Sequence, residues 1–213
     1  MSDLVYRERP PAGTPSGLLV LHHGRGTDEN DLFGLADLFD PKRRLHVVTP
    51  RAPLPFPGSP GYAWYQLASV GFPHPETFRQ SYGELAAFHN ELWARTQLTP
   101  EQTILGGFSM GTVMSYALGL GGDRPAPKGI LALSGFIPTV DGWQPSFADR
   151  KPLKVFIAHG SNDPVIGVEF ARGARDALVE AGLEVDYHES QAAHHVDPRT
   201  LPEAIDWITE LTS

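Results

Sequence analysis

Short runs of apolar residues recur along the chain at spacings that suit buried β-strands. Six such runs are Gly17–His22, Leu45–Thr49, Thr103–Gly106, Gly129–Ser134, Leu153–Ala158 and Glu184–Glu189. Most are apolar at consecutive positions, which is typical of parallel strands that are covered on both faces. A further strand near Leu4–Arg7 would lie at the edge of the same sheet.

Between these runs, apolar residues repeat every three or four positions, which indicates helices. The best marked helices are expected at 78–92, 109–120, 170–181 and 201–211. Gly182 is placed to end the third of them. Thr200 and Glu203 have the spacing of a capping box at the start of the last. The polar run Thr27–Asp31 offers capping residues for one more helix.

Strands that alternate with helices predict an α/β fold, with a mostly parallel central sheet and helices on both faces. No internal repeat or linker-like tract divides the sequence, so residues 1–213 are expected to form a single domain. In such folds, ligands bind beyond the carboxyl ends of the strands. Functional residues are therefore expected in the loops that follow the predicted strands.

The segment Pro53–Pro75 does not fit this alternation. It holds six prolines and five aromatic residues. A long loop of this kind is usually either functional or disordered, and its aromatic content argues against disorder. The simpler alternative is a surface loop whose rings only cover an edge of the sheet.

The composition of the chain argues against several classes of function. The net charge is −8 and the pI is near 5.5, which argues against nucleic acid or an anionic membrane surface as the main partner. The chain has no cysteine, which excludes disulfides and a thiolate nucleophile. The N-terminal residues lack the apolar stretch of a secretory signal, and the run at 18–21 is too short to span a bilayer. We therefore expect a cytoplasmic protein with no membrane span.

One serine is a candidate nucleophile. The sequence Gly107-Phe-Ser109-Met-Gly111 matches G-x-S-x-G and lies between a predicted strand and a predicted helix. In that setting the motif holds a serine on a strained turn, and side chains in place of the glycines would collide with the strand and the helix. The alternative is a glycine-rich turn in which Ser109 only caps the helix.

A serine hydroxyl needs a base to become a nucleophile. When the serine lies on a strained turn of this kind, the acid follows it along the chain and the histidine comes last. Asp163 lies in the loop after the fifth apolar run, and His194 and His195 follow the sixth. Asp176 and Asp186 are alternative acids, but one lies inside a predicted helix and the other inside a predicted strand. The three groups can therefore meet at one edge of the sheet.

Acyl transfer also needs donors for the negative charge on the carbonyl oxygen. The backbone N–H of Met110 follows the nucleophile, and glycines 24 and 26 let the amide of Arg25 turn inward while its side chain points elsewhere. The same loop lacks both phosphate-binding glycine patterns. A metal site built from the His22–His23 and His194–His195 pairs lacks an accompanying carboxylate pattern. We therefore expect no metal site.

These motifs, "HGRG", "GFSMG", "HGSNDPVI" and "HHVDP", together resemble the phospholipase/carboxylesterase family of α/β-hydrolases, from about Leu18 to the C-terminal helix. The resemblance implies an α/β-hydrolase fold with little or no cap domain, no cofactor and a possible homodimer. It implies Ser109 as nucleophile, Asp163 as acid, and the amides of Arg25 and Met110 as oxyanion donors.

The catalytic histidine of the family usually follows a glycine. Here Ala193 takes the place of that glycine and His194 that of the catalytic base, with His195 as its neighbour. Met110 and Thr112 replace the glutamine and second glycine of the family's common "GFSQGG".

The aromatic pair Trp64–Tyr65, with Phe72, is expected to line the substrate pocket. The resemblance favours a carboxylesterase acting on small ester substrates with short-to-medium acyl chains. A lysophospholipase or acyl thioesterase is the alternative within the hydrolases. A ligand-binding scaffold without turnover is the alternative of another class.

Overall fold

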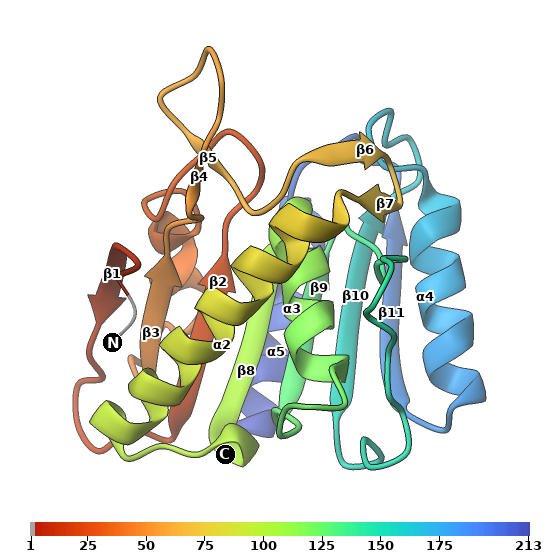
Figure 1. Cartoon of the computed structure of the whole chain (residues 1–213). Coiled ribbons are helices and arrows are strands. Elements are labelled where there is room, and N and C mark those ends of the chain that lie inside the picture. Colours follow the sequence, from red (N-terminus) through yellow and green to blue (C-terminus); the bar gives the residue numbers. More distant parts are fainter. Residues whose placement is uncertain (1–2) are drawn as a thin grey trace.

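The computed structural model describes residues 3–213 and is built around a seven-stranded sheet (Figure 1). The strands lie in the order β1-β3-β2-β8-β9-β10-β11. β1 is antiparallel to β3, and the other neighbouring strands are parallel. Their bounds are β1 Tyr6–Arg9, β2 Gly17–His22, β3 Leu45–Pro50, β8 Thr103–Phe108, β9 Gly129–Leu133, β10 Lys154–Gly160 and β11 Glu184–Ser190. This is the predicted α/β fold.

Burial explains why these runs form strands. Every residue of β2 and of β9 is buried, as expected for strands with helices on both faces. β11 lies at the edge of the sheet and is partly exposed along its length. The predicted edge strand forms as β1, and its ladder with β3 runs from Tyr6–Pro50 to Arg9–Val47.

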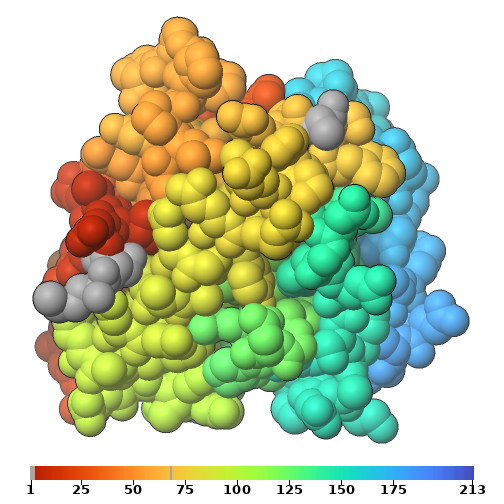
Figure 2. Space-filling model, viewed as in Figure 1, coloured from red at the N-terminus to blue at the C-terminus, as the bar shows by residue number. Residues whose placement is uncertain are grey.

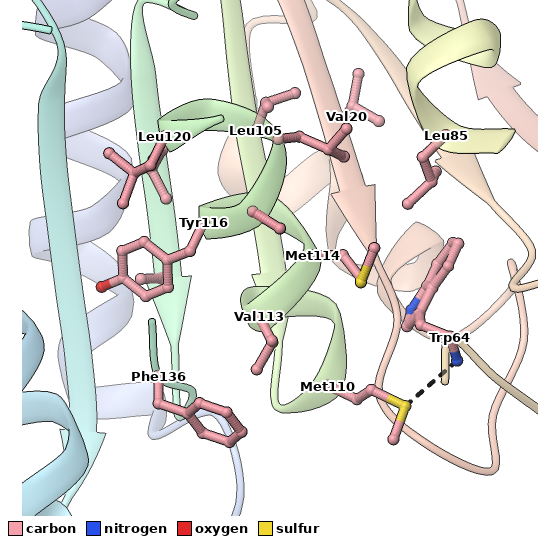
Figure 3. Close-up of a cluster of buried hydrophobic side chains, with 14 of the residues drawn as sticks. Val20, Trp64, Leu85, Leu105, Met110, Val113, Met114, Tyr116, Leu120 and Phe136 are labelled. Carbon is pink, nitrogen blue, oxygen red and sulfur yellow. Dashed lines mark hydrogen bonds between the residues drawn. The ribbon is translucent and has the colours of Figure 1, made fainter. Parts of the chain in front are cut away.

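The helices cover both faces of the sheet. α2 (Pro75–Thr96), α3 (Met110–Leu120) and α4 (Val168–Glu180) lie on the near face in Figure 1, and α1 (Ala36–Phe39) and α5 (Leu201–Leu211) lie behind. Each side has its own cluster of buried apolar residues. In Figure 3, Leu85 on α2 and Met114 on α3 face Val20 and Leu105 of the sheet. Gly182, with a φ of 80°, follows the end of α4 as predicted.

Two predicted helix starts differ from the structure. The Thr200 side chain caps nothing; its hydroxyl donates to the Asp197 carbonyl, and the Asp197 carboxylate accepts from the Arg199 amide. A 3₁₀ turn, η3 (Pro198–Thr200), therefore precedes α5. The run Thr27–Asp31 is followed only by η1 (Leu32–Leu35) and the four-residue α1, and Asp31 makes no capping bond.

The aromatic and proline-rich segment forms two small hairpins above the carboxyl edge of the sheet (Figure 1). β4 (Leu54–Pro55) pairs with β5 (Tyr62–Ala63), and β6 (Leu67–Ser69) pairs with β7 (Phe72–Pro73). The first hairpin is the orange projection at the top of Figure 2. Within residues 3–213 no helix covers this edge, so a helical cap is absent from the part of the chain described.

Candidate active site

The order of the strands determines where the residues of the site lie. The chain runs from β2 outward to β3 and then returns to place β8 on the other side of β2. Ligands in open α/β sheets bind where the strand order reverses in this way. The loop after β2 carries Arg25 and the turn after β8 carries Ser109, so the topology places these two residues side by side at the carboxyl edge.

Ser109 sits on a strained turn between β8 and α3. Its φ of 54° and ψ of −118° are unfavourable for a residue with a side chain. A Cβ on Gly107 would lie 2.4 Å from the Gly111 carbonyl carbon, and a Cβ on Gly111 would lie 1.9 Å from the His22 carbonyl oxygen. The collisions expected from the sequence are confirmed, and they explain why glycine is required at both positions.

Three side chains from different loops form a hydrogen-bonded chain at this edge. The Ser109 hydroxyl lies 2.9 Å from His194 Nε2, and His194 Nδ1 lies 2.6 Å from Asp163 Oδ2. Because an ionised carboxylate can only accept, Nδ1 carries the proton and Nε2 is free to accept from the serine hydroxyl. His195 is exposed and takes no part in this chain.

Asp163 is held as an anion by its own turn. Its Oδ1 accepts from the amides of Val165, at 2.8 Å, and Ile166, at 2.9 Å. Burial opposes ionisation, but these amides and the bond from His194 outweigh it and lower the pKa of Asp163. The carboxylate is therefore charged at neutral pH and able to orient the imidazole.

His23 fixes the loop that carries Arg25. Its Nδ1–H donates to the Gly24 carbonyl at 2.7 Å, and its Nε2 accepts from the Ala52 amide at 2.9 Å. The Gly26 amide donates to the Tyr62 carbonyl at 2.8 Å. Met110 is the first residue of α3, where backbone amides have no acceptor inside the helix. The Arg25 side chain lies over the Phe56 ring, 5.3 Å from its centroid.

A small cavity of about 50 Å³ opens beside Ser109. Its lining residues are mostly apolar: Arg25, Tyr65, Leu67, Val70, Ser109, Met110, Phe136, Val165 and Ile166. Of the three predicted pocket residues, only Tyr65 is among them. Trp64 is fully buried in the core, where its Nε1–H donates to the His23 carbonyl and its amide faces Met110 Sδ (Figure 3). Phe72 lines an adjacent groove instead.

The position of Trp64 corrects the expectation that the adjacent Trp64 and Tyr65 rings both face substrate. Both residues lie in the bend that follows β5 and both are buried, Trp64 in the core and Tyr65 in the wall of the cavity. The Trp64 ring contacts His22 and His23, at 5.6 and 5.2 Å between centroids, and so supports the loop of Arg25 from below. The segment is thus more than a surface covering.

The model of the phospholipase/carboxylesterase family matches residues 9–212. The chain belongs to the phospholipase/carboxylesterase family. It is 26% identical to an acyl-protein thioesterase 1 of Candida albicans over 99% of both chains. An esterase named PE8 is 30% identical, with a TM-score of 0.82 over 98% of this chain and 99% of its own. A carboxylesterase of Bacillus cereus shares the fold, with a TM-score of 0.86 at 23% identity over 99% and 95% of the two chains.

Membership makes the chain a serine hydrolase of the α/β-hydrolase fold, from a family whose members are carboxylesterases and acyl-protein thioesterases. Among the residues that the structure describes, no helix is both long and apolar enough to cross a membrane. No group of three or more potential metal ligands is found in that same part of the chain.

Several residues of the site were not found from the sequence. Phe136 and Ile166 line the cavity, and each lies just beyond a strand end, which was the available signal. Thr112 bonds the carbonyls of Gly107, at 2.6 Å, and Leu133, at 2.7 Å, and so ties α3 to the ends of β8 and β9. Nothing in the local sequence indicated that role.

Proposed function

We propose that the protein is a serine carboxylesterase that hydrolyses carboxylic esters through an acyl-enzyme on Ser109. The observation that carries the proposal is the unbroken chain of hydrogen bonds from the Ser109 hydroxyl through His194 to Asp163. It joins a strained serine, an imidazole of defined tautomer and an ionised carboxylate, which is the arrangement that activates a hydroxyl as a nucleophile.

In the first half-reaction, Ser109 Oγ attacks the ester carbonyl carbon while its proton passes to His194 Nε2. The tetrahedral intermediate collapses as the bond to the alcohol oxygen breaks, and His194 returns the proton to the leaving alcohol. In the second half-reaction, His194 takes a proton from water, the resulting hydroxide attacks the acyl carbon, and Ser109 leaves with that proton. Asp163 stays ionised and stabilises the imidazolium.

The oxyanion would be held by the backbone amides of Arg25 and Met110. Supporting this, both residues line the cavity with Ser109, and His23, Trp64 and Gly26 fix the loop before and after Arg25. A donor that is already in place needs no rearrangement when charge develops, and each is worth about 3 kcal/mol of barrier height.

The cavity favours short-to-medium acyl chains. Its volume of about 50 Å³ is far below the roughly 300 Å³ at which pockets begin to enclose drug-sized ligands. Its apolar walls suit a hydrocarbon chain of a few carbons.

A long-chain lysophospholipase or thioesterase activity has one observation in its favour. An apolar groove of about 310 Å³, with Phe72 and Phe170 in its walls, adjoins the cavity and shares Phe136 with it. A relative in Candida albicans carries the name acyl-protein thioesterase 1. If long chains enter this groove, kcat/KM should rise with acyl length beyond about eight carbons, and Phe72→Ala should lower it for long chains only. A fall beyond short-to-medium chains would support the carboxylesterase.

The proposal is tested by labelling the protein with a fluorophosphonate and locating the adduct by peptide mass spectrometry. We expect an adduct on Ser109 that is absent in Ser109→Ala, and a loss of labelling and of esterase kcat of about 10³-fold or more in His194→Ala. His195→Ala is the matched control and should label normally. Normal labelling of His194→Ala would contradict the role of His194 as the base. No labelling of the folded native protein would favour a binding scaffold without turnover.

The remaining expectations stay predictions from the sequence and the family resemblance. These are a cytoplasmic location, a homodimer and the absence of a cofactor. Sedimentation of the purified chain at micromolar concentration would test the homodimer.

A further inference from the structure

In the described part of the chain, Arg25 is the one charged residue that lines the cavity beside Ser109, and its side chain lies over Phe56. The other residues that line this cavity are uncharged. Arg25 is exposed, as are Leu67, Val70 and Val165, so these residues form the rim of the cavity, whereas Tyr65, Ser109, Met110, Phe136 and Ile166 are buried. The cavity therefore has an apolar interior and one cation at its edge.

This cation has no carboxylate partner within residues 3–213. Most arginines of this acidic chain do have one: Arg9 pairs with Asp40, Arg51 with Glu29 at 2.6 Å, and Arg95 with Glu8 at 2.8 Å. Arg25 instead lies over the face of Phe56, 5.3 Å from the ring centroid. Its hydrogen-bond donors are left available to a ligand.

Packing of the first hairpin against the Arg25 loop holds the Arg25 guanidinium in place. Phe56 belongs to the first hairpin, where its amide donates to the Gly61 carbonyl at 2.8 Å. That hairpin lies so close to the Arg25 loop that a Cβ on Gly61 would be 1.9 Å from the Gly26 carbonyl oxygen. A cation stacked on a fixed ring loses less freedom when it binds an anion than one on a free side chain.

The charge also acts inside the cavity. Burial raises the pKa of the Tyr65 phenol, and the charge of Arg25 opposes that rise. In addition, the guanidinium carbon can lie at most roughly 7 Å from the Arg25 amide nitrogen, the length of its side chain. Since that amide is the proposed oxyanion donor, an anion a few bonds from the ester carbonyl is within reach of the guanidinium.

We infer that the Arg25 side chain binds an anionic group, a carboxylate or a phosphate, on the alcohol part of the ester and so selects acidic substrates. The inference rests on the proposed function, because it takes the acyl chain to occupy the apolar walls beside Ser109. The leaving alcohol then faces the rim, where Arg25 is exposed. Planar, bidentate binding of carboxylate or phosphate is what a guanidinium does best.

The test compares two nearly isosteric esters, 4-(butanoyloxy)butanoate and its neutral amide 4-(butanoyloxy)butanamide. We expect native protein to favour the anion by about tenfold in kcat/KM, and Arg25→Gln to reduce that ratio to about one. Arg25→Lys should keep part of the preference and Arg25→Glu should invert it. Because every variant keeps the backbone amide, and because a ratio cancels effects common to both esters, the readout isolates the side-chain charge.

Lys42→Gln removes the same charge at the opposite end of the sheet and should leave the ratio unchanged. The ester 2-(butanoyloxy)ethyl phosphate separates the two anions: a larger Arg25-dependent preference identifies phosphate, and a smaller one identifies carboxylate. A native ratio near one, or a ratio that Arg25→Gln does not alter, would overturn the inference. Either result leaves Ser109-dependent hydrolysis intact, whereas turnover by Ser109→Ala would overturn the proposed function itself.

Discussion

At the scale of single residues, the Asp163 carboxylate depends on a second histidine. His159 is buried and donates from Nε2 to the Ile166 carbonyl at 2.8 Å, while the Ile166 amide donates to Asp163. His159 Nε2 also lies 3.6 Å from Asp163 Oδ2. The His159 imidazole thus stabilises the turn whose amides bind Asp163, and Asp163 in turn orients His194.

We expect His159→Leu to lower kcat by about tenfold with little change in KM, because Asp163 would lose its fixed position while the cavity keeps its walls. His159→Gln can still donate to the Ile166 carbonyl and should recover part of the loss. Steady-state kinetics with a butanoate ester measure both parameters, and thermal unfolding identifies any variant that has merely lost stability. Equal kcat values for His159→Leu and native protein would contradict this role.

At the scale of elements, the chain begins its last helix differently from the expected capping box. Thr200 has helical backbone angles, φ −98° and ψ 0°, so its side chain cannot reach the amides beyond it. Asp197 takes the capping role one 3₁₀ turn earlier and also accepts from the Arg199 guanidinium. This turn follows directly on His194 and His195, so the cap also anchors the loop that carries the base.

Asp197→Ala should therefore lower the melting temperature by roughly 2–4 °C, the usual effect of a lost cap in a domain of this size. Thr200→Ala should have a smaller effect, since it removes only one hydroxyl bond to the Asp197 carbonyl. Calorimetry of both variants at neutral pH decides between the two caps. A larger loss in Thr200→Ala would favour the capping box expected from the sequence.

At the scale of the whole molecule, a buried histidine pair links the sheet to two helices. His22 on β2 lies with Nδ1 2.8 Å from the Ser115 hydroxyl of α3 and Nε2 3.4 Å from Nε2 of His89 on α2. Burial, with a smaller contribution from His23, lowers the pKa of His22 to about 3, and burial also lowers that of His89 well below 6.5. Both are neutral in the folded protein.

The unfolded chain binds protons at these histidines below about pH 6.5, whereas the folded chain does not, so stability is lost as pH falls from 6.5 toward 3. Each neutral histidine should steepen this loss by about 1.4 kcal/mol per pH unit. His22→Gln should make the slope shallower by that amount. Urea denaturation at several pH values between about 4.5 and 6.5 measures the slopes, and parallel lines for the two proteins would contradict the expectation.

The order and spacing of local patterns were sufficient for much of this protein. Consecutive apolar runs and 3.6-residue periodicity predicted the strands of the sheet and its main helices, because burial acts on each short segment in the same way wherever it lies. The strained turn at Ser109 could also be predicted from the sequence. It leaves no room for a Cβ on Gly107 or Gly111, so the five consecutive residues 107–111 are enough to indicate it.

The tertiary structure decided what depends on distances between segments far apart in the chain. The resemblance indicates His194 as the base, but only the strand order brings its imidazole to hydrogen-bond distance from Ser109 and Asp163. The strand order also buries Trp64 while leaving Tyr65 at the cavity, and it places Arg25 there without a carboxylate partner. Local patterns do not fix these contacts, because each contact depends on which loops become neighbours once the sheet has formed.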